Sequence, residues 1–311
     1  MLLRVLVLLF LLAAVGLPVR GEETSTAAGD ANWLDRSHEL LSDRTQQAAI
    51  WFDSFFGDQR DTEVPASIST RISLGWKTSH HGVNDNFIRI RAKARLPQLK
   101  ERFYLILSNE EEDDYNLLPL EASRPESAAR SDDEFNAALR WIKENIASGE
   151  VDAQLGLRSW SDVYLRGRYH RFFNLSKASE LRLTPEVFID SEYGLGSRLL
   201  SEVDYLFDHP GLVRFSLRGQ VASETERLDW RSGLSYTYRF SKKSAIVTGF
   251  YMNGASDEND VENYSASIRL RQNFWRPYLY YEIEPYLDWP DADGYRTDYG
   301  IALSLHMVIA K

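Results

Sequence analysis

Cysteine is absent from all 311 residues, which excludes disulfides, thiolate metal sites and cysteine nucleophiles. Long hydrophobic runs are also scarce. After residue 21, no stretch approaches the roughly 18 continuous apolar residues that a transmembrane helix requires. A basic surface stripe is lacking too, since the net charge is −10 and the acids gather between segments rich in arginine. This distribution argues against nucleic-acid binding. The chain also lacks an HExxH motif, a nucleophile elbow and a phosphate loop.

Residues 1–21 have the organisation of a secretory signal peptide. Arg4 supplies the positive start, and the apolar run Val5–Val15 is short for a bilayer span. Small residues before Glu22 predict that the mature chain begins there; an uncleaved anchor helix is the alternative. An export signal without a membrane-spanning helix leaves two destinations, namely the periplasm or exterior, and a barrel in the outer membrane.

Residues 22–65 form a polar leader that contains a predicted short helix, Ser37–Phe56, with a loose apolar stripe. We considered two interpretations. In the first, this is a periplasmic helix packed on the rim of a barrel. In the second, it is a plug that offers Glu39, Asp43 and Asp53 to cations in a lumen.

Alternation with a period of two begins at Ala66 and continues to the C-terminus, and it is clearest in Phe87–Leu96. There, aliphatic residues occupy every second position and four cations occupy the positions between. A helix cannot separate the two sets in this way. Fourteen such segments are predicted: 66–76, 87–96, 102–108, 135–142, 150–159, 162–173, 178–189, 194–207, 211–222, 228–240, 243–253, 262–273, 278–288 and 295–309. For the fourth segment, a helix through Trp141 and Ile146 competes.

Three features favour a membrane barrel over a soluble sheet. Most segments run ten residues or more, whereas an ordinary strand has about five or six. If the first strand runs outward, the inner connections are mostly short and often basic. The outer ones are acidic and include the long connector Asn109–Glu134. Aromatic residues recur at segment ends, where a bilayer interface would lie: Trp76, Phe172, Phe173, Phe207, Trp230, Phe240, Phe274, Trp275 and Trp289. We therefore predict an all-β fold, a transmembrane antiparallel β-barrel of about fourteen strands over residues 66–311.

The last hairpin, RQNFWRPYLYYEIEPYLDWP and the strand after it, resembles the C-terminal end of Gram-negative outer-membrane β-barrel proteins. More narrowly, it is similar to an uncharacterised proteobacterial set with a comparable "NF.RP…EIEP…WP" run. The matching residues are Asn273, Phe274, Arg276, Pro277, Glu282, Ile283, Glu284, Pro285, Trp289 and Pro290. This resemblance implies a fold and an outer-membrane location, and it implies no activity. The chain ends in Ala310-Lys311, without the terminal aromatic residue that is usual in these proteins.

Hairpin spacing predicts which inward side chains face one another. Four oppositely charged pairs follow: Arg182 with Glu202, Glu186 with Arg198, Asp204 with Arg214, and Arg269 with Glu282. His170 is expected beside Glu180, and His306 is expected to face inward on the last strand. A register slip of one residue would move such charges into lipid, at about 2–4 kcal/mol for each Arg or Lys near the midplane.

The inward cations are the strongest functional indication in the sequence. They comprise Arg89, Arg91, Lys93 and Arg95, together with Arg71, Arg166 and Arg168. The neighbours expected for the first four are serines, Arg71, Tyr104 and Ile106. Their charge would therefore be met by water, by a passing anion, or by acids of the N-terminal helix. A lumen lined in this way favours anionic solutes.

We predict a passive outer-membrane channel for small anionic solutes. The alternatives are a structural or complex-forming barrel with a filled, salt-bridged interior, and an outer-membrane hydrolase or lipid-modifying enzyme. No catalytic residue, metal site or cofactor is predicted. His80 and His81 with Asp85 are the nearest approach to a catalytic group, but adjacent histidines on an extended chain point apart. The expected partners are outer-membrane lipid and lipopolysaccharide, the barrel-assembly machinery and a small anion; the oligomeric state is not predicted.

Overall fold

The computed structural model describes residues 68–81, 84–96, 103–109, 135–146, 149–158, 162–191, 193–257, 261–276 and 278–310. The predicted signal peptide, the leader 22–65 with its helix, and residues 110–134 of the acidic connector lie outside these ranges. Within them, no helix is long and apolar enough to cross a membrane.

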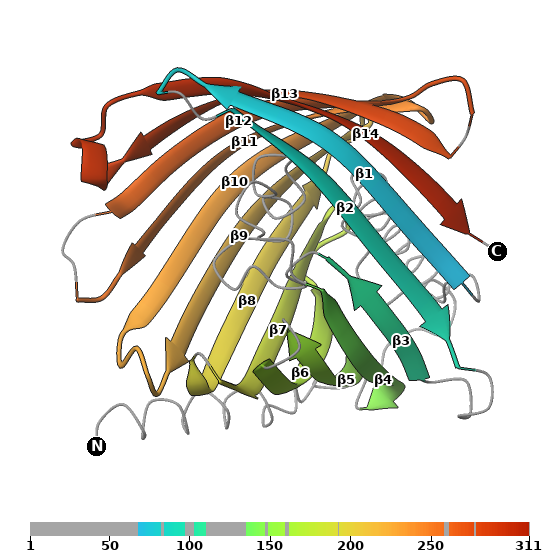
Figure 1. Ribbon diagram of the computed structural model, residues 1–311, viewed down its shortest axis with the longest axis vertical. Helices are drawn as coiled ribbons and strands as arrows, with labels where there is room; N and C mark the ends of the chain where they lie inside the picture. The colour runs from blue at the N-terminus through green and yellow to red at the C-terminus, as the bar shows by residue number, and fades with distance from the viewer. Residues whose placement is uncertain are drawn as a thin grey trace, which may run out of the picture. The chain divides into compact units, whose positions relative to one another are not determined.

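Fourteen antiparallel strands close into one barrel (Figure 1). Each strand pairs with its neighbours along the chain, and β1 pairs with β14. The strands are β1 (Ile68–Ser79), β2 (Asn84–Arg95), β3 (Phe103–Ser108), β4 (Asn136–Ile146), β5 (Gly149–Arg158), β6 (Asp162–Asn174), β7 (Ser179–Asp190), β8 (Gly194–Leu206), β9 (Gly211–Ala222), β10 (Leu228–Ser241), β11 (Ser244–Ala255), β12 (Val261–Asn273), β13 (Leu279–Pro290) and β14 (Asp298–Ala310).

The prediction of a fourteen-stranded antiparallel barrel is confirmed, and every predicted segment overlaps one observed strand. The helix that competed for residues 135–146 does not form, because this segment is β4 and pairs with β3 and β5. A 3-10 turn, η2 (Asp291–Asp293), precedes β14.

Side chains alternate between an inward and an outward set along the strands, and on most strands the inward set is largely polar and the outward set apolar. β11 is an exception, because its buried inward residues include Ala245, Val247 and Tyr251. On the outward face, large aliphatic side chains are widely exposed, for example Ile88 at 59%, Val163 at 56% and Leu195 at 61%. The inward face buries arginines and carboxylates, among them Arg140 and Glu282 at 1% exposure each. This is the reverse of a soluble protein, which buries apolar side chains and rarely buries charges.

Aromatic side chains lie near both ends of the strands. At the end with the short turns, ring contacts connect Tyr205 with Phe207 and Tyr238 with Phe240. At the other end, the indole N–H groups of Trp76 and Trp289 donate to Asn84 (2.7 Å) and Thr297 (2.9 Å). Each of these tryptophans thus presents an apolar ring and a satisfied polar atom, as interfacial tryptophans do.

Phe172 departs from this arrangement. The guanidinium of Arg182 lies 5.0 Å over its ring, on the inward face of β6. The prediction that Phe172 faces an interface was wrong because this residue falls on the inward parity of β6.

Two inward glycines allow an aromatic ring to lie flat against the wall. Gly156 on β5 is directly opposite Tyr164 on β6, and Gly196 on β8 is directly opposite Phe188 on β7. A Cβ at Gly156 would come within 2.2 Å of the Tyr164 ring, and a Cβ at Gly196 within 2.3 Å of the Phe188 ring. Glycine at these positions therefore permits close packing of neighbouring strands.

Candidate functional site: the barrel interior

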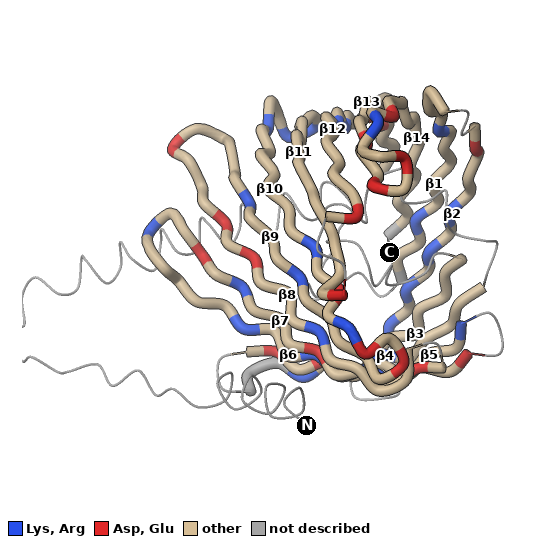
Figure 2. Tube along the Cα trace, turned by 90° about the vertical axis from the view of Figure 1, so that its left-hand side faces the viewer, with Lys and Arg blue, Asp and Glu red and all other residues tan. Residues whose placement is uncertain are grey.

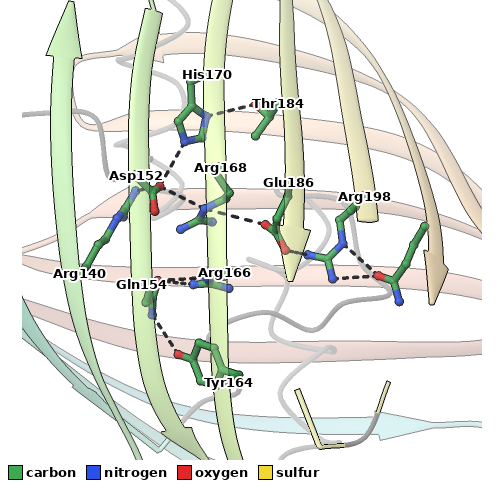
Figure 3. Close-up of polar contacts among 11 residues, drawn as sticks. Arg140, Asp152, Gln154, Tyr164, Arg166, Arg168, His170, Thr184, Glu186 and Arg198 are labelled. Carbon is green, nitrogen blue, oxygen red and sulfur yellow. Dashed lines mark hydrogen bonds and ion pairs between the residues drawn. The ribbon is translucent and has the colours of Figure 1, made fainter. Parts of the chain in front are cut away.

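A row of charged side chains crosses neighbouring strands inside the barrel (Figure 3). Near one end of this row, two guanidinium groups and one imidazole approach the same carboxylate oxygen of Asp152 on β5. Arg140 of β4 bonds it from one side, while Arg168 Nε (3.1 Å) and His170 Nε2 (3.3 Å) of β6 approach it from the other. Asp152 is fully buried, so the neighbouring guanidinium groups stabilise a carboxylate that water cannot solvate.

The row continues across β7, β8 and β9. Arg168 lies 3.9 Å from Glu186, and the other carboxylate oxygen of Glu186 lies 3.2 Å from Arg198. Arg198 then donates twice to Gln220, at 3.0 and 2.8 Å. Positive and negative groups therefore alternate from β4 to β8, and we name the set Arg140, Asp152, Arg168, Glu186 and Arg198 the ion-pair belt.

A second group of ion pairs joins β7, β8 and β9. Arg182 lies 3.4 Å from Glu202, and Arg214 forms a two-pronged pair with Asp204 at 2.6 and 2.9 Å. Arg214 also approaches Glu202, at 3.8 Å. The register places Arg182 opposite Glu202, Glu186 opposite Arg198 and Asp204 opposite Arg214, as the hairpin spacing predicts.

The predicted pair Arg269–Glu282 was wrong. Arg271 is opposite Glu282, with Nε at 2.7 Å, whereas Arg269 pairs with Glu284 at 3.1 Å. The turn explains the difference: Phe274 N–H donates to Leu279 O, and Trp275 has a left-handed φ of 56°. This turn is centred one residue later than assumed, which moves the partner of Glu282 by two positions.

Each of the two inward histidines lies beside a carboxylate. His170 contacts Asp152 and Thr184 (3.2 Å), not the predicted Glu180, since the register of β6 and β7 places Glu180 opposite Asn174. His306 Nε2 lies 3.0 Å from Glu282, and its Nδ1 lies 2.7 Å from Ser73 Oγ. An ionised carboxylate only accepts hydrogen bonds, so in a neutral imidazole Nε2 carries the proton and Nδ1 accepts from Ser73.

Ser73, His306 and Glu282 thus have the connectivity of a serine–histidine–carboxylate triad. Two features point to a structural role instead. First, Ser73 is only 2% exposed. Second, the backbone N–H groups of β1 around Ser73 are used in ladder hydrogen bonds with β14 and β2, so these N–H groups cannot stabilise an oxyanion. Among the described residues, no group of three or more histidine, aspartate and glutamate side chains is placed to hold a metal ion.

Buried charges in the described interior are balanced. Nine arginines and nine carboxylates are buried, so the buried residues together contribute no net charge. The arginines are Arg140, Arg158, Arg166, Arg182, Arg198, Arg214, Arg231, Arg269 and Arg271, and the acids are Glu150, Asp152, Glu180, Glu186, Asp190, Glu202, Asp204, Glu282 and Glu284. Among the described residues, any imbalance of charge in the interior must come from side chains that are only partly buried.

The half-buried cations concentrate on β1 and β2. Figure 2 shows Lys and Arg positions following one another along these two strands, whereas both signs occur along β7 and β8. We name this surface the cation wall; its members are Arg71, Arg89, Arg91, Lys93 and Arg95, each of intermediate exposure. Arg89 lies 5.4 Å over the ring of Phe87, and Lys93 lies 4.7 Å over that of Tyr104. All five cations make further contacts.

Arg166 and Arg168 also face inward, but their partners differ from those of the cation wall. Arg166 is buried and donates through Nε and Nη2 to Gln154, while Arg168 belongs to the ion-pair belt. Sequence reasoning grouped them with the cation wall because it missed the role of Asp152 and Gln154. Asp152 and Gln154 lie at inward positions of β5, and this parity is the signal that could have identified them.

His80 and His81 occupy the turn after β1. The ring of His80 stacks on Tyr299, at 4.6 Å between centroids, and His81 Nδ1 lies 3.1 Å from Asp298. Both histidines therefore join the end of β1 to the beginning of β14.

On the same rim, Arg227 pairs with Asp229 (2.8 Å) and Asp257 (3.5 Å). Partial burial opposes its charge, but the two carboxylates outweigh this effect and raise the pKa of Arg227 above its ordinary value.

The exposed apolar face, the aromatic residues at both strand ends and the polar interior together define a class. In hydrocarbon, every backbone polar group must be paired within the protein, which a closed barrel achieves and an open sheet does not. The chain is a transmembrane β-barrel.

Comparison with known proteins adds little. No family model matches the sequence, and no curated protein matches it. Among solved structures, the chain is similar to a KdgM porin in complex with disordered oligogalacturonate (6% identity, 76% of this chain and 98% of that chain, TM-score 0.38). It is also similar to OmpT, an outer membrane protein of Vibrio cholerae (8%, 80% and 99%, TM-score 0.44), and to OccK11 of Pseudomonas aeruginosa (9%, 78% and 96%, TM-score 0.44). At these values, the function has to be argued from the residues of this chain.

Proposed function

We propose that this protein is a passive outer-membrane channel for small anions, with the cation wall as its selective surface. The observation that carries the proposal is the distribution of charge inside the barrel. In the described part of the interior, buried charges cancel, nine against nine, and the half-buried cations of β1 and β2 add a surface of one sign. A surface of one sign in a low-dielectric enclosure raises the local concentration of the opposite ion.

The size of the barrel is compatible with passage. About eight strands already enclose an interior that side chains can fill, and barrels of 16–18 strands contain an aqueous channel. Fourteen strands lie between these limits. The ion-pair belt lies on β4–β8, so we place the path along β1 and β2, on the far side of β3 from the belt, where the arginine and lysine side chains are only partly covered.

Planar-bilayer recording of the refolded protein tests the proposal. Under a KCl gradient, we expect stable conductance with a reversal potential that indicates anion preference. Arg91→Glu should move the reversal potential toward cation selectivity, because it replaces one cation of the wall by an anion. Arg276→Gln, in the turn after β12, serves as a control and should leave the preference unchanged. A correctly folded barrel that is electrically silent, or one that prefers cations, would contradict the channel.

A structural barrel is the second candidate, and the ion-pair belt favours it. Ion pairs with side chains at 0–13% exposure on successive strands fix the interior without any transport. Silent bilayers, with Arg91→Glu folding and inserting like the parent, would support this candidate. Deleting residues 22–60 tests the plug interpretation of the leader: a plug requires the conductance to change. Lipopolysaccharide and the barrel-assembly machinery are the partners expected under either candidate.

A further inference from the structure

We propose that the short turns after β10 and β12 bind the headgroup of an anionic phospholipid. The residues concerned are Phe240, Lys242, Lys243, Phe274 and Trp275, which we name the turn patch. In this assignment the two lysines contact the lipid phosphate, and the aromatic rings lie between the headgroups and the acyl chains. The proposal rests on the membrane placement of the barrel and does not require the interior to conduct ions.

The exposure of Trp275 is the first observation. Among the described residues, Trp275 is the most exposed of the large hydrophobic ones, at 82%. The turn that carries it is closed by two backbone hydrogen bonds, from Phe274 N–H to Leu279 O (3.2 Å) and from Leu279 N–H to Arg276 O (3.1 Å). A tryptophan suits a membrane interface, because its ring is apolar and its N–H requires a polar partner. We therefore assign Trp275 to the headgroup layer.

Cations lie in the same two turns. Lys242 and Lys243 form the turn between β10 and β11, and both are exposed. Asn273 N–H donates to Lys243 O at 2.7 Å, so this turn adjoins the end of β12. The guanidinium of Arg276 lies 5.6 Å over the ring of Trp275. Neither turn contains an acidic residue, so the charge of the two turns is positive.

The side chains on the outward face of the barrel change in character toward these turns. Ile268, in the middle of β12, is aliphatic and exposed. Nearer the turn, the ring of Phe274 contacts that of Tyr281, at 5.9 Å between centroids, and the Tyr281 hydroxyl donates to Gln272 Oε1 at 2.8 Å. On β10, Phe240 is 58% exposed at the last outward position before the lysines. Aliphatic, aromatic and cationic side chains thus follow one another in this order.

This order matches the layers of a phospholipid leaflet. Lys243 lies beside Asn273, which is five residues beyond Ile268. At about 3.4 Å per residue and a tilt of about 40° from the bilayer normal, five residues rise about 13 Å. Half of a hydrocarbon core is about 15 Å thick. With Ile268 near the midplane, the lysine side chains therefore reach the level of the lipid phosphates.

The sign of the charge selects the headgroup. A lysine ammonium binds phosphate as a point charge, and cations near a membrane surface attract anionic lipids. A zwitterionic headgroup has its own cation, which offsets its phosphate, so two lysines favour a lipid with a net negative charge. At the other end of the barrel, the connections after β9 and β13 carry acids, among them Glu224, Glu226, Asp291 and Asp293. The preference should therefore belong to the leaflet at the short turns, which is the periplasmic one in barrels of this kind.

Native mass spectrometry of the refolded full chain, released from a non-ionic detergent, tests the site. Phosphatidylglycerol and phosphatidylcholine with the same acyl chains are titrated separately. We expect phosphatidylglycerol to bind at least tenfold more tightly. Lys242→Gln and Lys243→Gln should each lower its affinity several-fold, and the double variant should lose most of the preference. Trp275→Ala should weaken the binding of both lipids, because the ring contributes whatever the headgroup.

Lys177→Gln is the matched control, because Lys177 is an exposed lysine in the short turn between β6 and β7. It removes one positive charge from the same end of the barrel, away from the turn patch, and should bind phosphatidylglycerol like the parent. Folding is checked for each variant by the mobility shift between unheated and heated samples on SDS gels.

Equal affinity of the parent for the two lipids, or an equal loss in Lys177→Gln, would overturn the proposal. Glycerol phosphate that binds as tightly as phosphatidylglycerol would overturn it in favour of a site for free phosphate. A dimer that Trp275→Ala converts to a monomer would overturn it in favour of an interface between copies. Lipid preference in an electrically silent barrel would overturn the channel alone, and anion conductance without lipid preference would overturn the turn patch alone.

Discussion

Ser73 Oγ on the first strand donates to His306 Nδ1 on the last strand at 2.7 Å, so a buried side-chain hydrogen bond crosses the seam where the barrel closes. On its other side, His306 reaches Glu282 of β13, which Arg271 of β12 holds at 2.7 Å. A continuous polar chain therefore links β12, β13, β14 and β1. Such a chain restrains the seam beyond the backbone ladder.

The first prediction concerns this seam. Ser73→Ala removes the donor to His306 and leaves a buried acceptor unsatisfied, which should cost about 1–3 kcal/mol. We expect a lower temperature for the loss of the compact form on unheated SDS gels. Ser235→Ala, at a buried inward serine of β10, is the control. Equal melting of the two variants would show that the seam bond contributes nothing.

The second prediction tests the register of the last inner turn. A double-mutant cycle between Arg271 and Glu282 should give a clear coupling energy, because the two side chains form a buried pair at 2.7 Å. Removing one partner alone should cost about 3–5 kcal/mol. The cycle between Arg269 and Glu282 should give a smaller coupling, since Arg269 pairs with Glu284. Urea unfolding in lipid vesicles measures both cycles, and the reverse order would contradict the observed turn.

The third prediction concerns the packing of the Tyr164 ring against Gly156. Gly156→Ala places a Cβ about where the ring now lies and should destabilise the barrel by about 1–3 kcal/mol through overpacking. Gly167→Ala is the matched control, because a Cβ at Gly167 meets no atom within 4 Å. In a Tyr164→Leu background, the cost of Gly156→Ala should shrink. A persistent cost would show that the ring is not the obstacle.

The fourth prediction tests the lipid-facing surface. Ile268 lies midway along β12, on the outward face, and is 49% exposed. Ile268→Arg should reduce insertion into vesicles, at about 2–4 kcal/mol if it lies near the bilayer midplane. Ile268→Leu should insert like the parent. Unimpaired insertion of the arginine variant would contradict the membrane-facing assignment of this side.

The sequence by itself determined the architecture of the barrel. Its period-two alternation separates aliphatic from charged residues at positions such as Ile88 and Arg89. The assignment of each residue to the inward or outward face therefore stays correct when the predicted strand ends are wrong by a few residues. Three of four predicted ion pairs also followed from it, since tight hairpins transmit register from one strand to the next. The predicted pair Arg269–Glu282 was wrong because the left-handed backbone at Trp275 moves the centre of the turn, and alternation carries no signal for that.

Contacts that span several strands were decided only by the tertiary structure. The closure of the barrel brings Ser73 within reach of His306, 233 residues away in the chain. It also gathers Arg140, Arg168 and His170 around one oxygen of Asp152. Parity assigns each of these residues to the inside, but it cannot say which cations share a carboxylate, because that depends on strand stagger and side-chain reach. The division of the interior into an ion-pair belt and a cation wall therefore emerges from the fold.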